Sequence, residues 1–248
     1  MRTLSFLALG SLALAACADT GQVTSPVESS IAAAGAAAAN AAATHTYRVT
    51  VTNLTTGQPL SPGVAVTHTN KVALFSMGAA ASEGIRLIAE NGDPTTAAAD
   101  LAGAAGIHSV VATTAPVGRI GGPVFPSSLS FEIDAAANAN YLSMSLMLIC
   151  TNDGFAGLDA ARLPGGFNEA VFYAAGYDAG TEVNDEVAGS IVGPCFGIGP
   201  VTGLMGGAGR TAENGVVHMH SGIQGIANLT SAHDWTGPVA RIVVQRIK

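Results

Sequence analysis

Charged residues are scarce in this sequence. They make up 11% of the 248 residues, whereas about 25% is typical of soluble globular domains. Low charge together with abundant glycine is more typical of an extracytoplasmic β-rich protein than of a cytosolic helical one. The formal net charge is −7 and no cluster of basic residues stands out, which argues against a nucleic-acid partner.

The sequence also lacks the common catalytic motifs. It has no Gly-x-Ser-x-Gly elbow, no His-Glu-x-x-His motif and no phosphate-binding loop that ends in Gly-Lys-Ser/Thr. Residues 197–209 are rich in glycine, but they lack the spacing of a dinucleotide-binding loop, and Pro200 blocks the start of a helix. We therefore predict that the protein is not an enzyme and has no catalytic residues.

No apolar run near the N-terminus is long enough to cross a bilayer. The run at residues 4–16 follows Arg2 and ends in small residues directly before Cys17. This is typical of a secretory signal, and a cysteine after Leu-Ala-Ala resembles the bacterial lipobox. We expect residues 1–16 to be a lipoprotein signal peptide and Cys17 to carry a lipid. An unmodified Cys17 behind a plain signal peptide is the alternative.

This start of the chain predicts an exported bacterial lipoprotein on the periplasmic or cell-surface side of the envelope. Ala18, in place of an aspartate, favours the outer membrane. Residues 17–44 begin with the lipidated cysteine and become almost pure alanine. They have no apolar face to bury, so we expect a tether, either a flexible spacer or a frayed helix. Residues 45–248 are then long enough to form one domain with a sizeable core.

Within that domain the hydrophobic pattern is mainly that of β-strands. Apolar residues at 47, 49 and 51 alternate with polar ones, as in a half-buried strand. Residues 129–133, 142–150 and 239–247 are further strand-like runs. An alanine-rich insertion at residues 79–105 instead predicts two short helices, 79–90 and 95–105, because an Asn-Gly stop and a proline separate them.

The remaining cysteines and one pair of histidines are candidates for special chemistry. Once Cys17 is lipidated, Cys150 and Cys195 are an even pair in an oxidising compartment, which predicts a disulfide, with two buried free thiols as the alternative. His218 and His220 would share a face of a strand, as a transition-metal pair does. A third ligand is not evident, and ordinary polar roles are the favoured interpretation.

Two acidic clusters are the most informative part of the sequence. Residues 151–159 and 177–186 each follow a strand-like run and combine carboxylates with glycines. At one end of a sheet these carboxylates would repel one another, and the only cationic residue in the interval is Arg162. Calcium is the natural counter-charge, because it takes six to eight oxygen ligands in a flexible geometry. The alternative is that the acids are solvated turn residues.

The same clusters resemble the paired signatures of the spondin N-terminal domain, found in F-spondin, mindin and stand-alone bacterial proteins. Residues 153–159 (Asp-Gly-Phe-Ala-Gly-Leu-Asp) are similar to the family's Asp-Trp-Phe-x-Gly-x-Asp segment. Residues 177–182 (Tyr-Asp-Ala-Gly-Thr-Glu) are similar to its Tyr-Asp-Ala-Gly-Thr-Asp segment. Gly154 stands where a tryptophan is usual, and Glu182 replaces an aspartate.

The resemblance implies an antiparallel β-sandwich with calcium in loops at one end, and a role in extracellular adhesion. It places Asp153, Asp178 and Glu182 in the acidic ligand positions. We therefore predict an envelope-anchored binding or adhesion module with a calcium site, a protein or glycan partner at the cell surface, and membrane attachment through Cys17. The alternatives are a structural lipoprotein in which a metal only staples loops, and a metal-assisted hydrolase that uses Asp153, Asp178 and a water.

Overall fold

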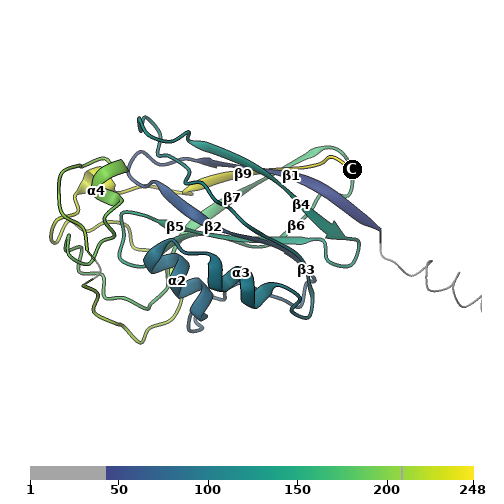
Figure 1. Cartoon of the computed structure of the whole chain (residues 1–248), viewed down its shortest axis with the longest axis horizontal. Coiled ribbons are helices and arrows are strands. Elements are labelled where there is room, and N and C mark those ends of the chain that lie inside the picture. The colour runs from purple at the N-terminus through teal and green to yellow at the C-terminus, as the bar shows by residue number, and fades with distance from the viewer. Residues whose placement is uncertain (1–42, 208) are drawn as a thin grey trace, which may run out of the picture. The chain divides into compact units, whose positions relative to one another are not determined.

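Nine strands form the body of the domain in the computed structural model, which describes residues 43–207 and 209–248 (Figure 1). The strands are β1 (Thr44–Asn53), β2 (Leu60–His68), β3 (Ile107–Ala112), β4 (Ser128–Ala136), β5 (Tyr141–Leu148), β6 (Gly154–Arg162), β7 (Glu169–Asp178), β8 (His218–Met219) and β9 (Ala240–Arg246). The predicted signal peptide, the lipidated Cys17 and the tether up to residue 42 lie outside the described residues, so those assignments stay predictions.

All strand pairings are antiparallel, and the strand order is β3-β2-β5-β6-β7-β9-β1-β4, with β8 paired to β7. Strand β7 joins the two halves of the sheet. Its first part, from Glu169 to Ala174, pairs with β9, and its last part, from Ala175 to Asp178, pairs with β6. The sheet therefore curls until it is nearly closed, and the predicted mainly β, antiparallel sandwich is confirmed.

The main core fills the space between the two halves of the sheet. Val49 and Val51 on β1 are fully buried there, together with Ile242 and Val244 of the neighbouring β9. The alternation of apolar and polar residues in β1 is what allows one face to point inward while Thr50 points outward. Each fully buried side chain of this size contributes about 1.5–3 kcal/mol to folding.

Two helices, α2 (Glu83–Asn91) and α3 (Thr95–Leu101), cover one outer side of the sheet (Figure 1). The Ser82 side chain caps α2 by accepting a hydrogen bond from the Ile85 amide, and Gly92 ends it with a φ of 66°. The helical insertion is thus confirmed, although α2 begins at its serine cap rather than at residue 79. Ile85 and Ile88 pack onto β2 and β6 and form a second apolar cluster.

A third apolar cluster lies beneath the loops around the short helix α4 (Cys195–Ile198). A disulfide joins Cys150 to Cys195, with 5.0 Å between their Cα atoms, which confirms the predicted bridge. Closing a loop with a sequence separation of 45 stabilises the fold by about 4 kcal/mol on the chain-entropy model. Within the part of the chain that the structure describes, no helix has the length and hydropathy that a membrane span needs.

The first and last described segments meet at one end of the domain, away from the acidic loops. Tyr47 near the start of β1 pairs with Arg246 near the C-terminus, and Gln245 pairs with Glu169 at the start of β7. Since β7 runs from Glu169 to Asp178, Asp178 lies at the opposite end, where the loops around α4 gather (Figure 1).

Candidate functional site

The two acidic clusters come together at the α4 end of the sheet. Asp153 ends the turn between β5 and β6, and Asp178 is the last residue of β7. Gly154 pairs with Asp178 across β6 and β7, and the Ala179 amide donates to the Asp153 carbonyl oxygen at 3.1 Å. The register of two neighbouring strands thus brings two carboxylates together that are far apart in sequence. Both carboxylates are buried.

Asp153 has one satisfied and one unsatisfied carboxylate oxygen. Its Oδ2 accepts hydrogen bonds from the Thr181 amide at 2.7 Å, the Thr181 hydroxyl at 3.1 Å and the Glu182 amide at 3.0 Å. Its Oδ1 is buried and has no hydrogen-bond partner. Burial first, and the charge of Asp178 second, raise the pKa of Asp153 from 3.8 to about 6, against these hydrogen bonds. Asp153 is therefore a carboxylate that lacks a counter-charge.

The Asp178 carboxylate is anchored on both oxygens. Oδ1 accepts from the Gly180 amide at 2.7 Å, and Oδ2 accepts from the Asn184 side-chain amide at 2.6 Å. The His218 imidazole lies nearby, with its Nδ1 3.8 Å from Oδ1. These contacts fix the direction of the carboxylate while leaving its charge beside that of Asp153.

Glu182 turns toward a different partner. Its Oε1 accepts from Asn152 Nδ2 at 3.0 Å, and its Oε2 lies 3.0 Å from Nε of Arg210. This contact is an ion pair without hydrogen-bond geometry. Arg210 donates a hydrogen bond from Nη2 to the Glu90 carbonyl oxygen at 2.6 Å. Burial raises the pKa of Glu182 to about 7, although Asn152 and Arg210 both favour its charged form.

Sequence reasoning missed Arg210 as a counter-charge, because it counted cations only between the two acidic clusters, where Arg162 is the one basic residue. Arg162 is the last residue of β6, whereas the acidic site lies at the first, roughly 25 Å away at the rise of a β-strand. A usable signal was present, because Arg210 is the one charged residue between Glu186 and Glu213. An isolated cation in a long uncharged segment is a candidate partner for a buried acid.

The three predicted calcium ligands do not form one compact set. Two oxygens on opposite sides of one calcium ion are about 4.8 Å apart, because calcium–oxygen distances are about 2.4 Å. Among the described residues, Asp153, Asp178 and Glu182 are not a group whose ligand atoms all lie within 4.8 Å of one another. Oδ1 of Asp153 has no partner and lies near the charge of Asp178, whereas Glu182 is paired with Arg210.

His218 and His220, the second candidate pair, have separate environments. His218 is exposed on β8, whereas the imidazole of His220 is mostly enclosed and packs against Trp235 with 5.0 Å between ring centroids. The Gly222 amide donates to Nδ1 of His220, and Nε2 has no partner. Burial lowers the pKa of His220, so the neutral ring is favoured. The two histidines belong to no three-ligand metal cluster within the described residues.

Several residues of the two signature segments have packing roles. Phe155 and Tyr177 stack on each other at 5.5 Å, and both pack against Phe75. A Cβ atom at Gly157 would lie 2.7 Å from both the Phe75 and the Tyr177 ring, so only glycine fits beneath this aromatic cluster. The Oδ1 atom of Asp159 accepts from the Leu74 amide at 3.1 Å and from a serine hydroxyl on β5.

The departure at Gly154 also has a structural reason. A Cβ atom there would lie 2.6 Å from the Thr151 hydroxyl oxygen and 3.0 Å from Cδ2 of His220. The Thr151 hydroxyl in turn accepts a hydrogen bond from the Gly154 amide at 2.9 Å. His220 thus occupies space that a larger residue at position 154 would need.

An open groove of about 630 Å³ lies beside the acidic site. It is lined by residues from β7, β8 and the segment before β9, among them Tyr173, Gly176, Met219, His220, Asp234 and Trp235. The Trp235 ring packs over Gly176, where a Cβ atom would lie 2.9 Å from the indole. Tyr173 and Met219 are exposed large side chains. The groove combines aromatic surface with a few polar groups, as ligand-binding sites commonly do.

The comparisons with known proteins agree with this geometry. The family model described as Spondin_N matches residues 43–185, which is more than half of the chain and includes both signature segments. No curated protein matches the sequence. The family is one of extracellular binding and adhesion modules rather than of known enzymes. Strand β9 and Arg210 lie beyond the matched residues and complete the fold and the acidic site. The chain belongs to the spondin N-terminal domain family.

Proposed function

We propose that this protein is an envelope-anchored binding or adhesion module whose loop end is ordered by calcium. The observation that carries the proposal is the buried Asp153–Asp178 pair, in which Oδ1 of Asp153 has no partner. A buried carboxylate that lacks a partner is costly, and proteins usually compensate it with a counter-charge or a metal. Family membership supports an extracellular setting for such a site.

In this proposal Asp153 contributes its unpartnered Oδ1 and Asp178 contributes its carboxylate. The bound calcium would supply positive charge to the pair and draw further oxygens from nearby backbone, side chains or water. Glu182 is the third predicted ligand, and it can take part only if its carboxylate leaves Arg210. Asp153 Oδ2 already holds the backbone of Thr181 and Glu182. The hydrogen bonds of Asp153 thus hold the loop at Thr181 and Glu182 against the side chain that would bind calcium.

The groove beside the acidic site is the surface that we propose for the partner. Tyr173 and Trp235 offer aromatic faces, and Asp234 offers a carboxylate within the same hollow. Sugars bind to such surfaces, because their apolar faces pack on aromatic rings and their hydroxyls accept and donate hydrogen bonds. We therefore favour a glycan over a protein as the partner.

The position of the groove suits attachment through the N-terminus. The described domain begins at Ala43, and its first strand starts at the end opposite to the acidic loops. A lipid on Cys17 would therefore connect to the domain away from the proposed binding surface. This arrangement favours an anchored binding module over a structural lipoprotein in which a metal only staples loops.

Calorimetric titration with calcium, and separately with magnesium, tests whether the acidic site binds calcium selectively. Calcium should bind and magnesium should bind poorly, because magnesium requires a small octahedral site. Binding to an array of defined glycans, with and without chelator, tests the function. Wild type should bind in a calcium-dependent manner and Trp235→Ala should not bind. Calcium binding without any glycan binding would favour the structural alternative, and hydrolysis of an arrayed substrate would favour the hydrolase.

A further inference from the structure

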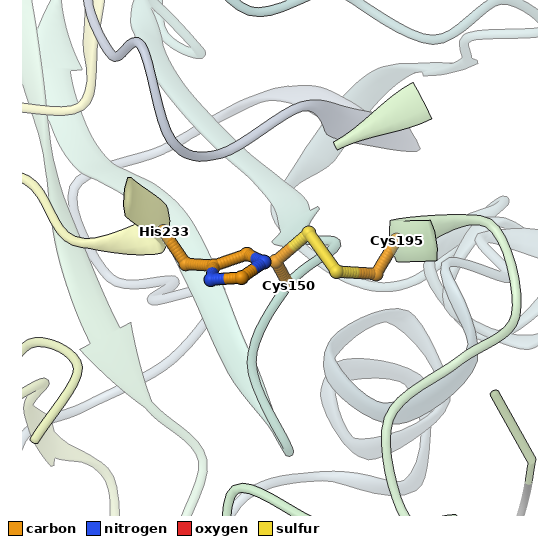
Figure 2. Close-up of side chains that lie close together, drawn as sticks. All are labelled: Cys150, Cys195 and His233. Carbon is orange, nitrogen blue, oxygen red and sulfur yellow. A yellow bond between two sulfur atoms is a disulfide. The ribbon is translucent and has the colours of Figure 1, made fainter. Parts of the chain in front are cut away.

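A second group of potential metal ligands lies in the apolar cluster under the α4 loops. Within the described part of the chain, one set of three His, Cys, Asp or Glu ligand atoms lies within 4.8 Å of one another: Cys150, Cys195 and His233. All three residues are fully buried. Figure 2 shows the His233 ring beside the two sulfur atoms, which form the disulfide. None of these residues belongs to the acidic site.

His233 is held with one ring nitrogen free. Its Nδ1 accepts a hydrogen bond from the amide of Thr230 at 3.0 Å. Thr230 is the N-cap residue of the 3-10 helix η1 (Ser231–His233). Its Nε2 is buried and has no hydrogen-bond partner. A buried polar atom without a partner is rare, and this one lies within reach of both sulfurs. Its position next to two cysteines is that of a third ligand.

Two of the three residues, Cys150 and His233, are also fixed relative to each other by Gln58. This buried side chain accepts a hydrogen bond from the Cys150 amide at 2.9 Å. It donates from Nε2 to the carbonyl oxygens of Cys150 at 3.0 Å and of His233 at 2.6 Å. One amide therefore connects the backbones that carry one sulfur and the imidazole. Such outer contacts orient metal ligands.

We propose that Cys150, Cys195 and His233 form a zinc site when the disulfide is reduced. A dithiol reductant would supply two electrons and two protons, becoming a disulfide itself while the two cysteines become thiols. Zinc would then replace the two thiol protons, which are released to water, and bind two thiolates and the imidazole. Two thiolates and one histidine are a known zinc ligand set, with water in the fourth position.

Zinc binding requires only local movement. Two sulfurs bound to one tetrahedral zinc are about 3.8 Å apart, because zinc–sulfur distances are about 2.3 Å. Cys195 begins α4, a helix of only 4 residues between Pro194 and Gly199, so its side of the bridge can shift. Binding at Nε2 would require the imidazole proton to move to Nδ1. Nδ1 would then lose the hydrogen bond that it accepts from the Thr230 amide and donate instead to the Thr230 carbonyl oxygen, 3.3 Å away. The metal would keep the loop between the cysteines closed under reducing conditions.

The test uses the full chain with Cys17→Ser, which removes the third thiol, unfolded and refolded in a phosphine reductant, with alkylation and mass spectrometry to verify free thiols at Cys150 and Cys195. Titration with cobalt(II) should produce a thiolate-to-cobalt charge-transfer band, and added zinc should remove it. His218 and His220 offer no thiolate, so a metal ion bound to them would not produce this band. The oxidised wild type and a Cys150→Ser, Cys195→Ser double variant should show no band.

His233→Gln is the variant that tests the third ligand. It should weaken zinc binding by more than about a hundredfold, since changes in outer-shell contacts alone cost 10–100-fold. His108→Gln is the matched control and should leave the cobalt band unchanged, because His108 is exposed on β3 and lies outside the cluster. Absence of the band in reduced wild type would overturn the proposal, as would equal zinc affinity of wild type and His233→Gln. If His233→Gln does not refold, the histidine resonances of reduced wild type decide: a zinc-induced shift of His233 supports the site, and an unchanged His233 overturns it.

Discussion

Asp153→Asn should make the calcium-free protein more stable at neutral pH. The raised pKa of Asp153, about 6 against 3.8, means that the folded protein binds more protons than the unfolded chain between these two values. The free energy of unfolding therefore falls as the pH rises through this window, and the loss persists above it. At about 1.4 kcal/mol per pKa unit, the loss from Asp153 is roughly 3 kcal/mol.

The contacts of Asp153 make this substitution conservative. An asparagine oxygen can accept the same hydrogen bonds from Thr181 and Glu182 that Oδ2 accepts now. The amide nitrogen would take the place of the unpartnered Oδ1 and face Asp178 as a donor. The variant should be nearly as stable as wild type at pH 4 and up to about 3 kcal/mol more stable at pH 7 in chelator.

Calcium should remove this difference in stability. Wild type gains about 2.7 kcal/mol when calcium is present at a hundred times its dissociation constant, provided that the unfolded chain does not bind it. The variant should gain little, so the advantage that it has in chelator should disappear. Urea unfolding with the disulfide intact, at pH 4 and 7 and with calcium or chelator, measures all of these free energies.

The matched control is Asp100→Asn, which makes the same charge change at an exposed position on α3. It should change stability by less than about 0.5 kcal/mol in every condition. The difference between Asp153→Asn and wild type isolates this carboxyl from Glu182, whose pKa is also raised. If that difference is the same at pH 4 and pH 7 in chelator, the unpartnered carboxylate is not the source of the strain. If calcium stabilises both proteins equally, Asp153 is not a ligand.

Three further changes test the surroundings of the site and the predicted anchor. Arg210→Ala should lower the free energy of unfolding in urea by about 3 kcal/mol at pH 7 and by less at pH 5, because protonated Glu182 no longer needs a cationic partner. An equal loss of stability at both pH values would contradict the ion pair. Gly154→Ala should cost about 1–3 kcal/mol, because its Cβ overlaps Thr151, and an unchanged melting temperature would refute this packing. Cys17→Ser should release the protein from the membrane fraction, and equal retention of both forms would count against lipidation.

Strong periodicity made part of the fold predictable from sequence. The alternation around Val49 and Val51 and the β-branched run that became β9 gave strands in the predicted places. The Asn-Gly stop and the proline separated the two helices correctly. The disulfide followed from cysteine count and compartment, because an even pair in an exported domain favours bridging.

Strand β6 was missed for a physical reason. Its residues are mainly glycine and alanine, and its first four positions are all buried. Side chains this small give no alternation, and burial on both faces removes the polar positions that would mark one face. The predicted loop at residues 151–159 is therefore a turn that leads directly into a strand.

The acidic site was only partly predictable, because its pairings are long-range. The loop acids were visible as clusters, and the register of β6 and β7 does bring Asp153 and Asp178 together. The partner of Glu182 was hidden, since Arg210 is placed by loops that have no periodic pattern. The same is true of His233, whose position beside the disulfide depends on how the chain folds after β8.

The buried Asp153–Asp178 pair destabilises the fold, and the loops around it are held by contacts that oppose local unfolding. A buried carboxylate without a partner would ordinarily be relieved by local unfolding, which loops undergo easily. Here the turn that carries Asp153 follows directly after Cys150. The disulfide of Cys150 ties the loop end together and stabilises the fold by about 4 kcal/mol. On the other side, the Glu186 carboxylate accepts from the amides of Gln224 and Ile226 and closes the neighbouring loop. These contacts stop the loops from opening to relieve the repulsion, so the strain is retained in the folded state until a cation removes it. A site with this arrangement would bind its metal without first having to order its loops, which is why we place calcium there rather than regard the acids as ordinary turn residues.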